Sequence, residues 1–516
     1  MTIAKNQNNM QDFIKFWTVE LKDGSFKECK INHKKYIDFL QSCGFRRYDQ
    51  GHDYFFIRIK SNVIEEVSRN RIKDVVIQFI EDLPDEYLKK EGMKKEYLLG
   101  KFYSSPQTYF NDTKLSMLKP EPNLELNQDT KTEAYIYYKN GYVKCTAIGY
   151  ELLEYSTLNK LIWKNQIKDR NFENDSPEGM FYKFVYNIAN KDAERFLSIQ
   201  TLIGYSMHSF FDTKRKAINF TDSAISEMPE GRTGKTLLGQ GIAKVKNLCE
   251  ISGKDFKPRE DKHKYSNCSI DTQIVFLNDI RKNFDIENLF NDISDHITVD
   301  KKNQTPFTIN AKILISSNST FMVDGASAKD RIVEFEFSDH YSNIKSPYNE
   351  FKTWFFTEWD TKEWFHFDNF MVDCISKYLE HGIKEAKNIN LLERKRIEQT
   401  NPDFAEWMDE QIKEKSIYQK FDYDKKELHD RFLKAYPDYT DHKFFKLQRN
   451  FTNCLKKYAK LSEDLGNNFN ERRANGVSYI SFGQSQKERE QEDEKTNKYH
   501  EFNTELELVT DEKLPF

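Results

Sequence analysis

A glycine-containing loop between a strand-like and a helical segment carries the strongest chemical signal in the sequence. Residues 217–220 are apolar, residues 226–236 read SEMPEGRTGKT, and residues 237–245 follow a helical pattern. This order of strand, loop, Lys-Thr and helix is the one that a phosphate-binding P-loop needs. Glycines let backbone N–H groups face phosphate oxygens, and the helix N-terminus favours a bound anion.

The residue types in this loop suit a nucleotide with its magnesium ion. Lys235 reaches the β- and γ-phosphates, and the Thr236 hydroxyl suits Mg²⁺. The predicted binding residues are Gly231, Arg232, Thr233, Gly234, Lys235 and Thr236. Pro229 stands where the usual pattern has its first glycine. The alternative is an ordinary glycine turn before a helix.

Two further apolar strands end in polar side chains that suit phosphate hydrolysis. Residues 273–279 read QIVFLND, and Asp279 is placed to hold Mg²⁺ through water or to polarise the attacking water. Because Asn278 precedes it, a single carboxylate is available for the two roles, and which of them Asp279 takes stays open. Residues 312–318 read KILISSN, and Asn318 is expected to point its amide at the γ-phosphate or the attacking water. Both strand endings are also common as purely structural features.

The succession GRTGKT, IVFLND, a basic hairpin segment and KILISSN resembles the superfamily 3 helicases, a class of AAA+ ATPases. The chain particularly resembles the primase-helicases of poxviruses and phages, over roughly residues 181–383. This resemblance implies an α/β P-loop NTPase fold (an AAA+ helicase core) with ATP and Mg²⁺ as cofactors. It also implies a homo-oligomeric ring, usually a hexamer, around a strand of single-stranded or forked DNA.

In this family a β-hairpin projects into the ring and grips the DNA backbone. Residues 296–309 match it, with β-rich flanks around Lys301 and Lys302. Two lysines at a hairpin tip suit contacts with phosphates, which are independent of base sequence and sensitive to salt. An ordinary solvated hairpin tip is the alternative.

An arginine before the last strand of the family's core reaches the γ-phosphate bound by a neighbouring subunit. Arg331, before the alternating segment Ile332–Phe337, matches it, and Lys329 is the second choice. Such an arginine stabilises charge in the transition state of phosphoryl transfer. A surface salt bridge with Asp330 or Glu334 is the alternative for Arg331.

Hydrophobic patterns and turn signals predict the elements around this core. Residues 1–118 indicate a small α+β domain, which suits nucleic-acid binding and a docking or oligomerisation role equally. Residues 119–130 look like a linker, and 130–211 combine a hairpin with a helical collar or oligomerisation region. The expected elements are strands at 13–21, 54–59, 134–138 and 142–147, and helices at 33–43, 69–83, 177–190 and 192–211.

The C-terminal third indicates a lid, a linker helix and a separate domain. The ATPase core and lid span 212–385, with Trp354, Trp359 and Trp364 expected to pack in the lid. A linker, 386–415, contains a helix at 403–415. Residues 416–484 resemble a winged-helix domain, with helices at 425–436 and 441–461 and a hairpin at 471–482.

The second of these helices is amphipathic. Its predicted apolar stripe is Phe444, Leu447, Phe451, Leu455 and Tyr458. The residues predicted to bind DNA are Arg449, Lys456, Arg472 and Arg473. A solvated charged face is the alternative, because surface charges usually have no ligand.

Residues 485–516 form an acidic tail with ten acidic and five basic side chains, and we expect it to be disordered. Its end, Leu514-Pro515-Phe516, is similar to the tail of bacterial single-stranded-DNA-binding proteins, which recruits replication partners. An unstructured chain end without a partner is the alternative.

Composition limits the class of protein. The 516 residues are 38% hydrophobic and 31% charged with a net charge of −4, which argues against a histone-like cationic protein. Seven cysteines without CxxC spacing argue against a disulfide framework or a structural zinc site. No apolar run is long enough for a membrane span. We expect a cytoplasmic protein, in the bacterial host if the chain is phage-encoded.

Three functions remain open at this point. The first is a ring-forming, ATP-dependent DNA helicase or translocase of a phage-like replication system. The second is an ATP-switched initiator or loader, and the third is a replisome scaffold with weak ATPase activity, suggested by Pro229 and Asn278. Primase activity is not supported, since the first 200 residues contain neither zinc-ligand spacing nor a strand with paired carboxylates.

Overall fold

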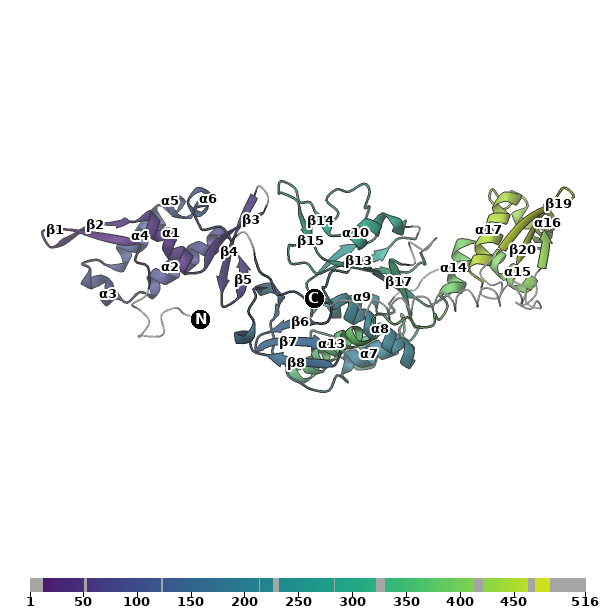
Figure 1. Ribbon diagram of the computed structural model, residues 1–516, viewed down its shortest axis with the longest axis horizontal. Helices are drawn as coiled ribbons and strands as arrows, with labels where there is room; N and C mark the ends of the chain where they lie inside the picture. Colours follow the sequence, from purple (N-terminus) through teal and green to yellow (C-terminus); the bar gives the residue numbers. More distant parts are fainter. Residues whose placement is uncertain are drawn as a thin grey trace, which may run out of the picture.

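The chain forms three lobes in a row (Figure 1). The computed structural model describes residues 13–50, 53–121, 124–212, 214–225, 232–282, 284–321, 330–412, 421–462 and 469–482. In the described part, no helix is long and apolar enough to cross a membrane. The seven cysteines, all within this part, are free thiols.

A five-stranded parallel sheet forms the centre of the middle lobe. Its strand order is β12-β13-β16-β11-β17, so the chain crosses over between neighbouring strands. The strands are β11 (Ala217–Asp222), β12 (Leu248–Ser252), β13 (Ile274–Ile280), β16 (Lys312–Ser317) and β17 (Ile332–Phe337). Continuous apolar runs form such strands because both faces of a parallel sheet are buried. The four strands predicted within this core are confirmed.

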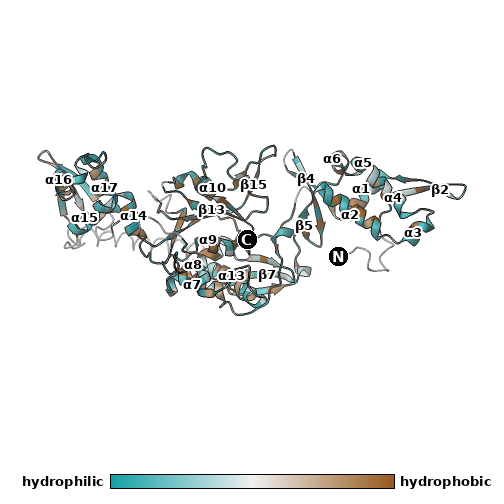
Figure 2. Ribbon diagram, turned by 180° about the vertical axis from the view of Figure 1, so that it is seen from behind, coloured by the Kyte–Doolittle hydropathy of each residue, from teal (hydrophilic) through white to brown (hydrophobic). Residues whose placement is uncertain are grey.

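Helices cover this sheet and a smaller sheet beside it. The helices are α7 (Met180–Ile188), α8 (Ala193–Met207), α9 (Lys235–Ala243), α10 (Phe290–Ser294), α12 (Pro347–Phe351) and α13 (Thr361–His381). Helix α13 packs against α8 so closely that a Cβ on Gly204 would lie 2.0 Å from the carbonyl oxygen of Cys374. Figure 2 shows hydrophobic segments around α8, α9 and α13, whereas α3 and α16 in the outer lobes are hydrophilic.

Helix α13 begins at Thr361, where Asp360 caps its N-terminus by accepting a hydrogen bond from the Glu363 backbone N–H. Trp359 is buried and Trp364 packs against the same core, as expected for the lid. The expectation for Trp354 is wrong: its side chain is 58% exposed and stacks on Tyr348 instead.

The smaller sheet has the order β10-β6-β7-β8 and contains the predicted hairpin. Its strands are β6 (Ala134–Tyr138), β7 (Gly141–Thr146), β8 (Gly149–Leu153) and β10 (Ile167–Lys168). The described residues of the segment predicted as a linker form no helix or strand, but they are bonded to their surroundings. Asp129 accepts hydrogen bonds from the backbone of Tyr135 and Ser209 and lies 3.6 Å from the ammonium group of buried Lys246.

The N-terminal lobe is an α+β arrangement with its own aromatic core. Its strands are β1 (Trp17–Lys22), β2 (Ser25–Ile31), β3 (Phe45–Gln50), β4 (Asp53–Lys60) and β5 (Val63–Glu66). Its helices are α1 (His33–Ser42), α2 (Arg69–Asp82), α3 (Asp85–Lys90), α4 (Lys95–Ser104), α5 (Pro106–Phe110) and α6 (Asp112–Leu115). Strand β9 (Ile162–Trp163) extends the sheet β3-β4-β5, so residues far along the chain complete this lobe.

The C-terminal lobe combines helices with a three-stranded antiparallel sheet of order β18-β20-β19. Its helices are α14 (Leu391–Gln399), α15 (Pro402–Ile412), α16 (Lys425–Ala435) and α17 (Gln448–Lys460). Its strands are β18 (Phe421–Asp424), β19 (Phe469–Ala474) and β20 (Val477–Phe482). The predicted hairpin is confirmed, with Asn475 and Gly476 both at positive φ in its turn.

The apolar stripe predicted for the helix at 441–461 is wrong at its start. Helix α17 begins at Gln448, so Phe444 and Leu447 lie before it and are 43% and 56% exposed. Phe451, Leu455 and Tyr458 are buried as predicted. The core of this lobe is already filled by residues of α15 and α16, among them Phe404, Trp407 and Phe432.

Candidate functional site

The carboxyl ends of β11, β13 and β16 bring most of the predicted site residues together. Helix α9 begins at Lys235, and its N-cap Gly234 has a φ of 105°, a conformation that favours glycine. A Cβ at Gly234 would also lie 2.7 Å from the Phe184 ring. Gly231 and Pro229 lie outside the described residues.

Lys235 is buried and surrounded by oxygen atoms. Its Nζ lies 2.5 Å from Asp222 Oδ1, 2.9 Å from Asn318 Oδ1 and 3.3 Å from Thr233 Oγ1. The Thr233 hydroxyl also donates to Asp222. Burial lowers the pKa of Lys235, and the neighbouring Asp222 carboxylate opposes that shift. Lys235, Thr233 and Asn318 thus lie together, around an aspartate that belongs to none of the predicted motifs.

The end of β13 presents its two polar residues in different directions. Asp279 has a φ of 61°, where the pairing register with β16 shifts. As a result Asn278 Oδ1 lies 3.4 Å from Thr236 Oγ1, while Asp279 Oδ2 lies 2.9 Å from Lys254 Nζ. The residue beside Thr236 is therefore Asn278, although Asp279 was predicted to share Mg²⁺ with this threonine.

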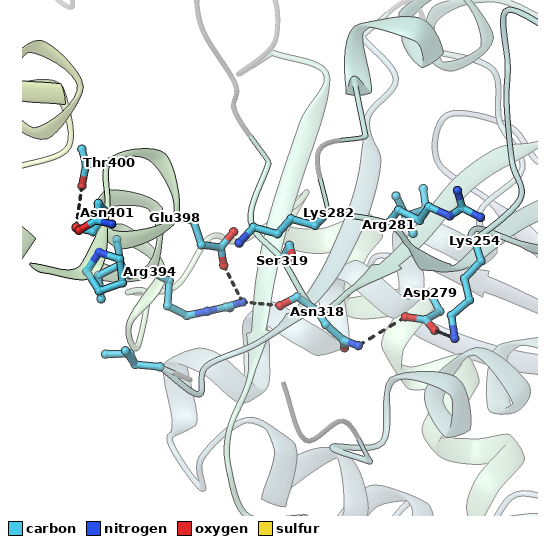
Figure 3. A pocket seen from close by; sticks show the side chains of 14 residues that line it. Lys254, Asp279, Arg281, Lys282, Asn318, Ser319, Arg394, Glu398, Thr400 and Asn401 are labelled. Carbon is cyan, nitrogen blue, oxygen red and sulfur yellow. Dashed lines mark hydrogen bonds and ion pairs between the residues drawn. The ribbon is translucent and has the colours of Figure 1, made fainter. Parts of the chain in front are cut away.

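Asp279 remains part of the site through Asn318. The Asn318 Nδ2 group lies 3.4 Å from Asp279 Oδ1, and the Asp279 backbone N–H donates to Ser316 Oγ at 2.8 Å. Figure 3 shows Asn318, Asp279 and Lys254 along one wall of a cleft of about 730 Å³. Hydroxyl and amide oxygens such as those of Thr236 and Asn278 are hard donors, which Mg²⁺ prefers. Within the described residues, no group of three or more His, Cys, Asp and Glu side chains is arranged to hold a metal ion.

Helix α14 forms the opposite wall of the cleft (Figure 3). The buried guanidinium of Arg394 donates to the backbone carbonyls of Asp222 and Asn318, the latter at 2.9 Å. Glu398 accepts hydrogen bonds from the backbone and hydroxyl of Thr320. Arg394 therefore ties the C-terminal lobe to the ends of β11 and β16. Sequence reasoning missed it because nothing near Arg394 in the sequence marks it as part of this edge.

Arg331 lies away from this edge. It precedes β17, so it lies at the amino end of the parallel strands, whereas Lys235 and Asn318 lie at the carboxyl end. Its Nε donates to Ser294 Oγ at 2.9 Å, and its guanidinium lies over the Phe290 ring. Within one chain Arg331 is not part of the candidate site. Lys329 lies outside the described residues.

The predicted basic hairpin is formed by β14 (Ile297–Val299) and β15 (Phe307–Ile309). Lys302 is exposed, and the ammonium group of Lys301 lies 5.8 Å from the centre of the Phe307 ring. In the same loop, Thr305 donates hydrogen bonds to Asp53 at the start of β4, so the N-terminal lobe touches this hairpin.

The four basic residues predicted to bind DNA in the C-terminal lobe differ in their surroundings. Arg449 and Arg473 are exposed. Lys456 lies 2.7 Å from a Glu471 oxygen, and Arg472 lies 2.7 Å from an Asp422 oxygen and over the Tyr479 ring. Such surface ion pairs contribute little, so phosphate groups are able to compete for both side chains. The tail Leu514-Pro515-Phe516 lies outside the described residues and stays a prediction.

Comparisons with known proteins do not assign a family. No protein-family model and no curated protein matches the chain. An apo structure of the NrS-1 C-terminal region is similar at 13% identity and a TM-score of 0.38, over 87% of this chain and 99% of that one. A second apo structure of that region gives 11% identity and a TM-score of 0.37, with coverage of 87% and 98%. A JCV helicase with a bound small molecule gives 13% identity and a TM-score of 0.25, over 45% of this chain and 61% of that one. TM-scores this low decide neither the fold nor the activity of this chain.

Proposed function

We propose that the protein is an ATP-dependent DNA helicase or translocase that works as a homo-oligomeric ring, a hexamer in the family it resembles. One observation carries the proposal: Lys235 and Thr236 begin a helix at the carboxyl edge of a parallel sheet, beside Asn278, Asp279 and Asn318. Nucleotides characteristically bind at this edge of open α/β sheets, against a helix N-terminus.

In this proposal each side chain of the site has a separate role. Lys235 exchanges its contact with Asp222 for the β- and γ-phosphates, since both partners are anionic. Thr236 and Asn278 offer oxygen ligands for Mg²⁺, which when bound neutralises charge on the phosphates. Asp279 accepts a proton from, or orients, the attacking water, and Asn318 holds that carboxylate in place.

Stabilisation of transition-state charge by Arg331 needs a second copy of the chain. Arg331 lies at the opposite edge of the sheet from Lys235, so it is proposed to reach the nucleotide of a neighbouring subunit. A ring that stacks the amino edge of one sheet on the carboxyl edge of the next satisfies this requirement. Arg331 would then stabilise transition-state charge between subunits.

DNA contact is proposed for two separate surfaces. Lys301 and Lys302 on the β14–β15 loop are proposed to meet phosphates in the ring, and Arg449 and Arg473, both exposed, are proposed to do so from the C-terminal lobe. The helices α16 and α17 followed by the β19–β20 hairpin have the order of a winged helix, which supports a DNA-binding role for this lobe. Phosphate contacts of this kind weaken as salt concentration rises.

The first test is magnesium-dependent ATP hydrolysis with and without single-stranded DNA, for wild type and Lys235→Ala. We expect DNA-stimulated turnover in wild type and a loss of at least about a hundredfold in the variant, because the contact to the β- and γ-phosphates is removed. Lys183→Ala, an exposed lysine on α7, is the matched control and should hydrolyse ATP like wild type. A forked duplex then tests unwinding.

A second candidate is an ATP-switched initiator or loader that does not unwind DNA. It is favoured by Asn278, because a second carboxylate is absent from the end of β13 and slow hydrolysis suits a switch. Turnover without strand displacement would favour this candidate. Nucleotide binding without any turnover in wild type would instead favour a scaffold, and would contradict the proposed motor.

A further inference from the structure

Glu250 on β12 contacts the residue that faces Thr236, although no motif includes it. Strand β12 pairs in parallel with β13, which carries the glutamate side chain along the end of the neighbouring strand. Glu250 Oε1 accepts a hydrogen bond from Asn278 Nδ2 at 2.7 Å. Glu250 is exposed, so this contact is not needed to fill the core.

Two partners determine which end of the Asn278 amide faces the nucleotide loop. Ser316 Oγ donates to Asn278 Oδ1 at 2.6 Å, and the same hydroxyl oxygen accepts from the Asp279 backbone at 2.8 Å. Because the Glu250 carboxylate only accepts hydrogen bonds, it takes the amide nitrogen. The amide oxygen is therefore the atom that lies 3.4 Å from Thr236 Oγ1.

A single carboxylate usually supplies both an oxygen ligand and a negative charge. Here Asn278 supplies the oxygen and Glu250 supplies the charge. Asn278 presents an oxygen toward Thr236 but carries no charge, whereas Glu250 carries a negative charge one hydrogen bond farther away. The nearby cations Lys235 and Lys254 each already pair with a carboxylate, Asp222 and Asp279 respectively. Glu250 thus adds a negative charge at the side of Asn278.

We propose that Glu250 is a positioning residue for the magnesium–nucleotide complex: it orients the Asn278 oxygen toward Thr236 and supplies the negative charge that Asn278 lacks. This proposal rests on the proposed function of the site. It also explains the asparagine, because a carboxylate at position 278 would lie at hydrogen-bond distance from Glu250 and the two charges would repel.

A charge swap tests the proposal with a binding readout. Electron paramagnetic resonance measures the affinity for Mn²⁺ in the presence of a non-hydrolysable ATP analogue. Glu250→Gln removes the charge, and we expect Mn²⁺ to bind on the order of threefold to tenfold more weakly. Adding Asn278→Asp to this variant restores the charge at the neighbouring position and should return the affinity to within about twofold of wild type. Glu260→Gln is the matched control, because Glu260 is an exposed carboxylate that pairs with Lys257.

The outcomes separate the two levels of the proposal. Wild type that binds no Mn²⁺–nucleotide complex overturns the proposed function itself. Wild type that binds it, with Glu250→Gln equal to wild type and to Glu260→Gln, overturns the role of Glu250. If Glu250→Gln weakens Mn²⁺ binding and the added Asn278→Asp does not restore it, the role of Glu250 is also overturned. This conclusion requires that thermal unfolding shows both variants to be folded.

Discussion

At the scale of single residues, the notable feature is that Lys235 pairs with a carboxylate of the protein itself, that of Asp222. Its ammonium group is buried against Asp222 and within hydrogen-bond distance of Asn318. Burial without a partner would be costly for this charge. The Asp222 carboxylate is therefore the anionic partner of Lys235 that a nucleotide phosphate is proposed to replace.

This exchange leads to a prediction for Asp222→Asn. Removing one charge of a buried ion pair leaves the other unpaired, so we expect the nucleotide-free protein to lose about 3 kcal/mol of unfolding free energy. Added ATP and Mg²⁺ should recover part of this loss, because phosphate gives Lys235 a new anionic partner. Thermal unfolding with and without nucleotide measures both effects.

The decisive comparison is the shift in Tm on adding nucleotide, which should be larger in Asp222→Asn than in wild type. Asp255→Asn is the control, because Asp255 forms an exposed pair with Arg281 and should change little. Equal shifts in wild type and Asp222→Asn would contradict the exchange of partners.

At the scale of elements, the small sheet and the central sheet meet through buried polar groups. Lys168 on β10 donates to Asn247 Oδ1 at 3.4 Å, and Arg170 two residues later, itself partly exposed, pairs with the buried Asp368 on α13. Burial lowers the pKa of Lys168 to about 7, with the charges of Arg170 and Lys246 adding to the effect. Asp271 and Asp368 oppose the shift. The contact between the sheets therefore holds a lysine that is costly to protonate.

The pH dependence of stability follows from this depressed pKa. An unfolded lysine titrates near 10.4, so between about pH 7 and 10 the unfolded chain binds more protons than the folded one. Stability should therefore rise with pH across this window. Lys168→Met removes this contribution, so we expect it to raise the Tm most below pH 7 and progressively less towards pH 10.

Unfolding of wild type and Lys168→Met at pH 6, 8 and 9.5 checks this expectation. Lys139→Met is a suitable control, because Lys139 pairs with Asp169 at the surface. A Tm difference that is the same at all three pH values would contradict it.

At the scale of the whole molecule, the two edges of the central sheet carry complementary parts of one proposed site. Lys235, Asp279 and Asn318 lie at the carboxyl edge, and Arg331 lies at the amino edge. A single chain does not bring these together, whereas the proposed ring of identical chains would join the two edges at every interface. Helix α14 and its Arg394 connect the carboxyl edge to the C-terminal lobe.

Mixing two inactive variants tests this arrangement. Lys235→Ala and Arg331→Ala should each hydrolyse ATP at least about a hundredfold more slowly than wild type. In a mixed ring, an Arg331→Ala subunit keeps its nucleotide site and receives an intact arginine from a Lys235→Ala neighbour. Mixtures should therefore recover part of the activity, measured as ATP turnover against the mixing ratio. No recovery, with mixed assembly shown by cross-linking, would contradict action between subunits.

Much of the secondary structure and part of the candidate site follow from the sequence alone. Local patterns predict the strands β11, β13, β16 and β17, because their apolar runs have no other stable placement than a buried sheet. β-rich flanks predict the hairpin at 296–309 and turn residues predict the one at 471–482, and the Gly-Lys-Thr loop predicts the helix α9 that follows it, although α9 begins two residues earlier than expected. These features depend on residues that are close together in the chain.

The tertiary structure alone decided which residues complete the site. Asp222, Glu250 and Arg394 join it because strand order and the path of α14 bring distant segments to one edge of the sheet. The register shift at Asp279 turns Asn278 rather than the aspartate toward Thr236, which no periodicity indicates. The start of α17 was missed for the same physical reason. Whether Phe444 and Leu447 are buried depends on what already fills the core of the lobe, not on their spacing along a helix.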